Sequence, residues 1–126
     1  MSATYVAGLI GALTPRDSGP RAQKMLVTDS AHVVVFEFDS GQELSDHAAR
    51  HPVLIQVLAG AATLSAEGVD YELIPGALVH LGSMETHAVK AHTKTTLTVT
   101  MLLLTFIGDA LRDAFVAATR RADAAG

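Results

Sequence analysis

The hydrophobic positions of the chain fall into short runs separated by turn residues, which is the pattern of β-strands. The run HVVVFEF at 32–38 is rich in β-branched and aromatic residues, and the turn residues DSG follow it. VLIQVLA at 53–59 ends at Gly60, and ATLSA at 62–66 follows at once, as in a tight hairpin. Further runs continue the pattern at 71–74, 77–81, 86–92 and 95–106. Short strands at this spacing predict an antiparallel sandwich or a small barrel.

Both ends of the chain depart from this pattern. Residues 14–24, TPRDSGPRAQK, contain two prolines and a glycine, so we expect a loop there after a short N-terminal element. From Ile107 to Arg121 the apolar positions recur at helical spacing, which predicts an amphipathic helix packed on the barrel or on a partner. The predicted organisation is an N-terminal element and loop at 1–24, a barrel at 25–106 and a C-terminal helix at 107–126.

The composition is typical of one globular domain. The chain has 126 residues, of which 49% are hydrophobic and 17% charged, so it can bury a core. Its net charge is −4 and its only adjacent basic residues are Arg120 and Arg121, which argues against nucleic-acid binding. The absence of cysteine excludes disulfides, thiolate metal sites and a cysteine nucleophile.

No segment of the sequence has the pattern of a membrane anchor or a leader. The longest uncharged apolar stretch, Thr95 to Gly108, is shorter than the roughly 20 residues that span a bilayer. The apolar stretch near the N-terminus follows MSAT, which lacks the basic residues of a signal peptide. We therefore expect a cytoplasmic protein that does not bind membranes.

Histidines are the residues best able to form a reactive group in this chain. Side chains alternate along a strand, so His87, Val89 and Ala91 are expected on one face and His92 on the solvent face. His47 comes just before the strand predicted at 53–59. For acid–base chemistry, His47, His87 and His51 are the only convergent group that can be assembled, and no catalytic role is assigned to them.

Two motifs in the middle of the chain resemble those of the cupin superfamily. Gly41, five residues, His47 and later Gly60 are similar to the first cupin motif, and Gly76 followed eleven residues later by His87 is similar to the second. The fifteen residues between Gly60 and Gly76 match the compact hairpin of small single-domain cupins. The resemblance covers residues 32–106 and implies an all-β fold, a cupin-type jelly-roll barrel (double-stranded β-helix), here followed by the C-terminal α-helix.

The chain departs from the cupin motifs at several ligand positions. Ala49 stands where the family has its second histidine, and Val53 stands where it has a glutamate. The proline, glycine and asparagine of the second motif are replaced by Gly82, Met84 and Ala91. Of the three histidines and one glutamate that the family uses to bind a metal, only His47 and His87 remain.

His51 is the candidate for a third metal ligand, because a useful site normally needs three. On a straight strand four residues cover about 13 Å, but a bent connection would bring His47 and His51 to one side. Pro52 restricts His51 to an extended conformation at the end of that connection. We predict a site of His47, His51 and His87 for a divalent transition metal such as Zn, Mn, Fe or Ni. The alternative is that His47 and His87 are buried polar residues that bind no metal.

Two function classes follow from the resemblance. The first is a metal-dependent small-molecule enzyme, in which the ion polarises a substrate or activates oxygen or water. The second is a metal-free ligand-binding or sensory barrel. We favour weak metal binding together with a small molecule in the barrel interior, and leave the reaction open. The resemblance also implies a homodimer, and the long apolar run TVTMLLLTF favours a covered outer sheet face.

Overall fold

The computed structural model describes residues 3–103 and Ala118. The helix expected at 107–121 lies outside the described residues, except for Ala118, which is helical and exposed. Within the described ranges, no helix is long and apolar enough to cross a membrane. The described strands are β1 (Arg21–Val27), β2 (Ala31–Phe38), β3 (Glu43–His47), β4 (Val53–Ala59), β5 (Ala62–Ala66), β6 (Val69–Leu73), β7 (Val79–Leu81), β8 (His87–Ala91) and β9 (Thr95–Leu102).

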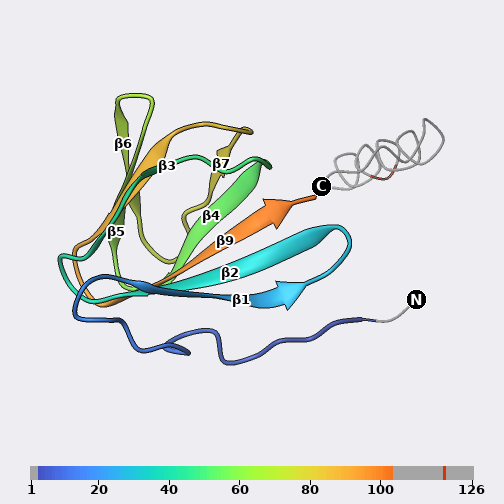
Figure 1. The fold of residues 1–126 in the computed structure, drawn as a ribbon, viewed down its shortest axis with the longest axis horizontal. Coiled ribbons are helices and arrows are strands. Elements are labelled where there is room, and N and C mark those ends of the chain that lie inside the picture. Colours follow the sequence, from blue (N-terminus) through green and yellow to red (C-terminus); the bar gives the residue numbers. More distant parts are fainter. Residues whose placement is uncertain (1–2, 104–117, 119–126) are drawn as a thin grey trace.

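The strands form two antiparallel sheets, as the hydrophobic pattern predicts (Figure 1). One sheet has the order β1-β2-β9-β4-β7 and the other β3-β8-β5-β6. Apart from the β1–β2 and β5–β6 hairpins, the chain changes sheet from each strand to the next. Strands distant in the sequence therefore become neighbours, and the pairing of β3 with β8 is the one that positions the candidate site.

The core lies between the two sheets and follows the alternation of the strands. On β4, Val53, Ile55 and Val57 are buried, whereas Gln56 between them is exposed on the outer face. Removing such side chains from water contributes about 25 cal/mol per Å² and drives the sheets together. The largest fully buried apolar side chains are Phe38, Ile55, Leu64, Leu73 and Leu97.

Strand β1 begins at Arg21, inside the segment 14–24 where the sequence predicts a loop. Its first four residues are exposed, so no apolar alternation marks them, and the strand exists because it pairs with β2 along the edge of the sheet. Strand β3 is likewise a mostly polar edge strand that the apolar runs do not reveal. Edge strands of this kind avoid exposing long apolar surfaces.

Part of the outer face of the five-stranded sheet, on β2 and β9, is covered, as the long apolar run of β9 favours. Thr96, Thr98 and Glu37 point away from the core by alternation but are buried. The Gly11 N–H donates to Thr96 Oγ1 at 3.1 Å, and Thr96 Oγ1 donates to Glu37 Oε1 at 2.8 Å. The N-terminal segment of the chain itself therefore lies against this face. The burial of Glu37 is not visible in the sequence.

Candidate functional site

Strands β3 and β8 bring His47 and His87 directly opposite each other. The two residues are register partners, their ring centroids are 4.2 Å apart, and the ring planes are inclined by 57°. The register shifts between Leu44 and His47, where three steps on β3 match two steps on β8. Without that bulge, alternation would place His47 on the face opposite to Leu44, which packs against the core. The bulge therefore turns His47 to the inner side, where His87 lies.

The hydrogen bonds of His87 determine its tautomer. The side chain is buried, with 2% of its surface exposed, and its Nδ1 lies 3.1 Å from the Glu85 carbonyl oxygen. A carbonyl can only accept, so Nδ1 carries the hydrogen and Nε2 keeps a free lone pair in the neutral ring. A backbone carbonyl that orients a histidine in this way is typical of histidines that bind metals through the other nitrogen.

His47 is held in its neutral form. Burial lowers its pKa below the ordinary value of 6.5, the neighbouring His87 lowers this pKa further, and the Ser45 backbone opposes the shift less strongly. The Ser45 backbone does not provide a hydrogen bond of normal geometry, because His47 Nδ1 is buried without a partner among the described residues. A neutral imidazole with an unsatisfied buried nitrogen is able to accept a metal or a hydrogen-bond donor.

The connection that carries His51 is bent, and its backbone is hydrogen-bonded to the turn that precedes β8. The bend lies at Arg50 and His51, and His51 is half-buried. The Met84 N–H donates to the Ala49 carbonyl at 2.7 Å, and the Ser83 hydroxyl donates to the Arg50 carbonyl. Residues 3–103 contain no group of three histidines or carboxylates that could hold a metal ion. The site of His47, His51 and His87 therefore stays a prediction.

The positions of the two missing cupin ligands are apolar parts of the interior. Val53 belongs to the buried core, and Ala49 packs against it. Met84, at the glycine position of the second motif, adopts a left-handed φ of 66°, a conformation that glycine tolerates without strain. Met84 thus has a backbone conformation that suits the glycine of the motif.

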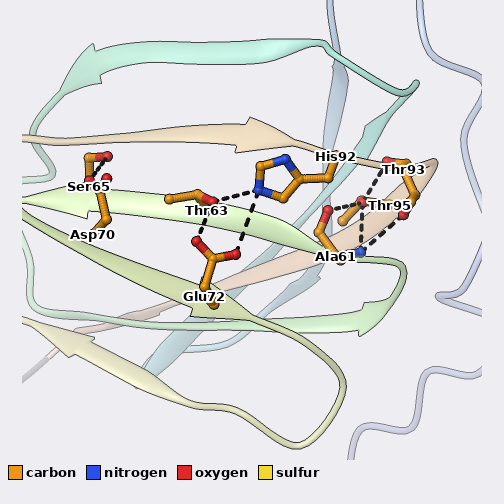
Figure 2. Close-up of polar contacts among 8 residues, drawn as sticks. All are labelled: Ala61, Thr63, Ser65, Asp70, Glu72, His92, Thr93 and Thr95. Atoms are coloured by element: carbon orange, nitrogen blue, oxygen red, sulfur yellow. Dashed lines mark hydrogen bonds and ion pairs between the residues drawn. The ribbon is translucent and has the colours of Figure 1, made fainter.

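A second polar cluster lies on the outer face of the four-stranded sheet, and sequence reasoning did not identify it (Figure 2). The Thr63 hydroxyl donates to Glu72 Oε1 at 2.7 Å, and His92 Nε2 lies 2.5 Å from Thr63 Oγ1 and 3.6 Å from Glu72 Oε2. His92 is exposed, as its parity predicts. The hollow beside these residues has a volume of about 540 Å³. Thr63 with Glu72 and Ser65 with Asp70 form hydroxyl–carboxylate pairs, and Glu43 forms an ion pair with Lys90, all in contact with solvent.

No protein-family model matches the chain, and no curated protein sequence matches it. Solved structures do match. An RmlC-like cupin from Desulfovibrio desulfuricans has a TM-score of 0.73 and 23% identity over 80% of this chain and 98% of that one. A cupin superfamily protein from Desulfitobacterium hafniense has a TM-score of 0.69 and 15% identity over 82% of this chain and 95% of that one. A protein from Klebsiella pneumoniae with a double-stranded β-helix domain has a TM-score of 0.68 and 19% identity over 79% of this chain and 91% of that one.

The two facing sheets and these likenesses define the chain as a double-stranded β-helix protein. It has the fold of the cupin superfamily, which the two glycine–histidine motifs predict. The identities are low, so the likeness describes the fold and leaves the chemistry to the residues of this chain.

Proposed function

We propose that this protein binds a small molecule in its barrel interior and weakly holds a divalent transition metal ion through His47 and His87. The observation that carries the proposal is the cross-strand register of the two imidazoles, with ring centroids 4.2 Å apart. Metal ligation requires neutral imidazoles, and the lowered pKa of His47 satisfies that requirement at neutral pH. His87 offers Nε2, because its Nδ1 hydrogen bonds to a backbone carbonyl.

The donor chemistry of this pair suits Zn, Mn, Fe or Ni, but it fills only two coordination positions. Water, the bound small molecule or His51 would fill the others. A bound ion would supply Lewis acidity to a ligand in the interior. The chain's own contribution is to hold the two rings on adjacent strands, with the Glu85 carbonyl fixing the orientation of His87.

The second candidate function is a metal-free ligand-binding or sensory barrel. It is favoured by the apolar residues Ala49 and Val53 at the positions of the missing ligands. It is also favoured by the lack of a three-ligand group within residues 3–103. In this case His47 and His87 would be polar groups that orient a ligand in an otherwise apolar interior.

Metal analysis of tag-free protein separates the two functions. In equilibrium dialysis against a saturating concentration of each metal, we expect about one bound ion per chain, as in other mononuclear sites. His87→Ala and His47→Ala should lose the ion, whereas the matched control His92→Ala, on the outer face, should keep it. His51→Ala tests the third ligand, because loss of affinity would include it in the site and unchanged affinity would exclude it. If the wild type binds no metal under any of these conditions, the metal-free barrel is the function that remains.

We also propose that the chain forms a homodimer. The N-terminal segment exposes large apolar side chains, among them Tyr5, which is 88% exposed, and Ile10. Isolated exposed side chains need no partner, but two on one extended segment favour contact with a second copy. Sedimentation velocity of the full chain should give a dimer, and Tyr5→Ser with Ile10→Ser should weaken it. A monomer at all accessible concentrations would contradict this proposal.

A further inference from the structure

A pocket of about 420 Å³ lies between strands β6 and β7. These are edge strands, since β6 pairs only with β5 and β7 pairs only with β4. No further strand joins the two sheets here among the described residues, so the space between them opens to the surface. Ala66 and Leu81, both core residues, form part of its lining. The pocket therefore reaches from solvent to the edge of the core.

Two large, exposed apolar side chains line this β6–β7 pocket, although most of its accessible lining is polar. Tyr71 is 42% exposed and Leu78 is 60% exposed, and both line the pocket. The other exposed large apolar side chains of segment 69–84, which are Val69, Ile74 and Met84, do not line the pocket. Exposed apolar side chains gathered at a pocket gain free energy when an apolar ligand displaces water from them. Tyr71 and Leu78 thus favour a ligand with an apolar body.

The charges of the pocket are negative. Glu67 and Glu85 both line it, His80 is the remaining ionisable side chain of the lining, and no lysine or arginine lines it. Neither carboxylate forms an ion pair or a side-chain hydrogen bond with another described residue. A bare metal ion would need more ligands than these, because no metal-binding group of three exists within residues 3–103. An ammonium group complements the charge of a carboxylate and, unlike a metal ion, needs no fixed set of ligands.

The β6–β7 pocket is next to the histidine pair. Ala66, part of its lining, is the register partner of His87 on the neighbouring strand. Glu85 lines the pocket with its side chain, while its backbone carbonyl lies 3.1 Å from His87 Nδ1. A ligand in the pocket would therefore lie beside the backbone that orients His87.

We propose that the β6–β7 pocket binds a small organic amine, with its apolar body against Tyr71 and Leu78 and its ammonium group near Glu67 and Glu85. The inference rests on the proposed function, because it names the class of small molecule that would bind beside the histidine pair. Tyr71 contributes an aromatic face to the amine as well as apolar surface.

The test uses hexylamine, with 1-hexanol and hexanoate as matched probes that share the apolar body. The chain has two tyrosines and no tryptophan, so Tyr5→Phe makes Tyr71 the only fluorescent reporter. We expect hexylamine to change Tyr71 fluorescence saturably, and 1-hexanol to bind about fivefold more weakly or worse, because each exposed ion pair contributes up to about 1 kcal/mol. Hexanoate, which the carboxylates repel, should not bind. Equal binding of hexylamine and 1-hexanol would overturn the proposal.

Variants locate the binding site. Glu67→Gln and Glu85→Gln should each weaken hexylamine binding by about twofold to fivefold and leave 1-hexanol binding unchanged. The control Glu43→Gln removes an exposed carboxylate from β3, outside the pocket, and should change neither. Unchanged hexylamine binding in both pocket variants would overturn the proposal. The proposal would also be overturned if a dimer of this chain had to dissociate before hexylamine binds, because a second copy of the chain would then occupy the pocket.

The two proposals fail separately. Hexylamine titration of the metal-free protein and of His87→Ala measures the pocket alone, and metal analysis without amine measures the histidine pair alone. If the protein binds the amine but no metal, the amine-pocket proposal stands and the metal proposal fails. If it binds metal but no amine, the metal proposal stands and the amine-pocket proposal fails.

Discussion

Replacing Gly60 with alanine should be far more damaging than the same change at Gly76, although both glycines belong to the motifs and both have positive φ. The φ values are 93° at Gly60 and 100° at Gly76. A Cβ at Gly60 would lie 2.6 Å from Thr95 Oγ1 and 2.8 Å from Thr95 Cα, and closer still to the Lys94 carbonyl. A Cβ at Gly76 would meet no atom within 4 Å. Comparing Gly60→Ala with Gly76→Ala therefore separates the cost of a positive φ, which both variants share, from the cost of steric overlap, which only Gly60→Ala has.

The contact at Gly60 cannot be relieved cheaply. Thr95 is buried, and its hydroxyl lies 3.1 Å from the Ala61 carbonyl and 2.8 Å from the Thr93 carbonyl (Figure 2). It also accepts from the Ala61 N–H at 3.3 Å. Moving Thr95 away from a new methyl group would break these bonds, and moving Lys94 would displace the turn between β8 and β9.

The expected losses follow from these contacts. Forcing an L-residue into a left-handed conformation costs about 1–2 kcal/mol, and the smaller entropy of the unfolded chain returns about 0.4–1 kcal/mol. Gly76→Ala should therefore lower the free energy of unfolding by about 1 kcal/mol. Gly60→Ala adds overpacking of about 1–3 kcal/mol and weakened hydrogen bonds of about 1 kcal/mol. Its total loss should be about 3–5 kcal/mol.

Urea unfolding followed by circular dichroism measures both variants in metal-free buffer. The slope of the free energy of unfolding against urea concentration should match that of the wild type if each variant has the same fold. Absence of a cooperative transition in Gly60→Ala, with one retained in Gly76→Ala, would also agree with the reasoning. Equal losses in the two variants would refute it, because φ alone would then explain the cost.

Two further changes test the site and the motif loop. The pKa of His47 is lowered below 6.5 in the folded protein, so the unfolded chain takes up a proton first as the pH falls. The free energy of unfolding of metal-free protein should thus be constant well above pH 6.5 for this group and decrease as the pH falls through 6.5 toward the lower folded-state pKa, by at most about 1.4 kcal/mol per pH unit. In His47→Asn the decrease should be smaller, and identical pH profiles from urea unfolding would contradict the assignment. Met84→Gly should raise the free energy of unfolding by about 0.5–1 kcal/mol, because φ is 66° and the side chain is 63% exposed; a thermal midpoint below that of the wild type would show that the Met84 side chain contributes packing.

The strands with apolar alternation could be predicted from the sequence. The structure places β4 and β5 at the predicted bounds, because their side chains alternate between a buried and an outer face. Strands β1 and β3 could not be found in this way, since their polar edge positions carry no such alternation. Glu37 was missed for a related reason: its burial comes from the outer side of the sheet, where alternation predicts solvent.

The candidate site was predicted in part. The motif spacing indicates that His47 and His87 face each other, and their register confirms this. His51 could not be placed from the sequence, because a bend of a few residues decides its distance from the pair. The β6–β7 pocket was also missed, since its lining comes from two sheets and a turn that the sequence does not show to be adjacent.

The sequence alone determined the strands of a two-sheet architecture, because side-chain alternation and turn chemistry are properties of the local chain. The resemblance to the cupin motifs singled out His47 and His87. Only the tertiary structure decided that a bulge before His47 turns its ring inward and that burial beside His87 lowers its pKa. Register, burial and charge proximity depend on strands that are distant in the chain and meet only when the two sheets form.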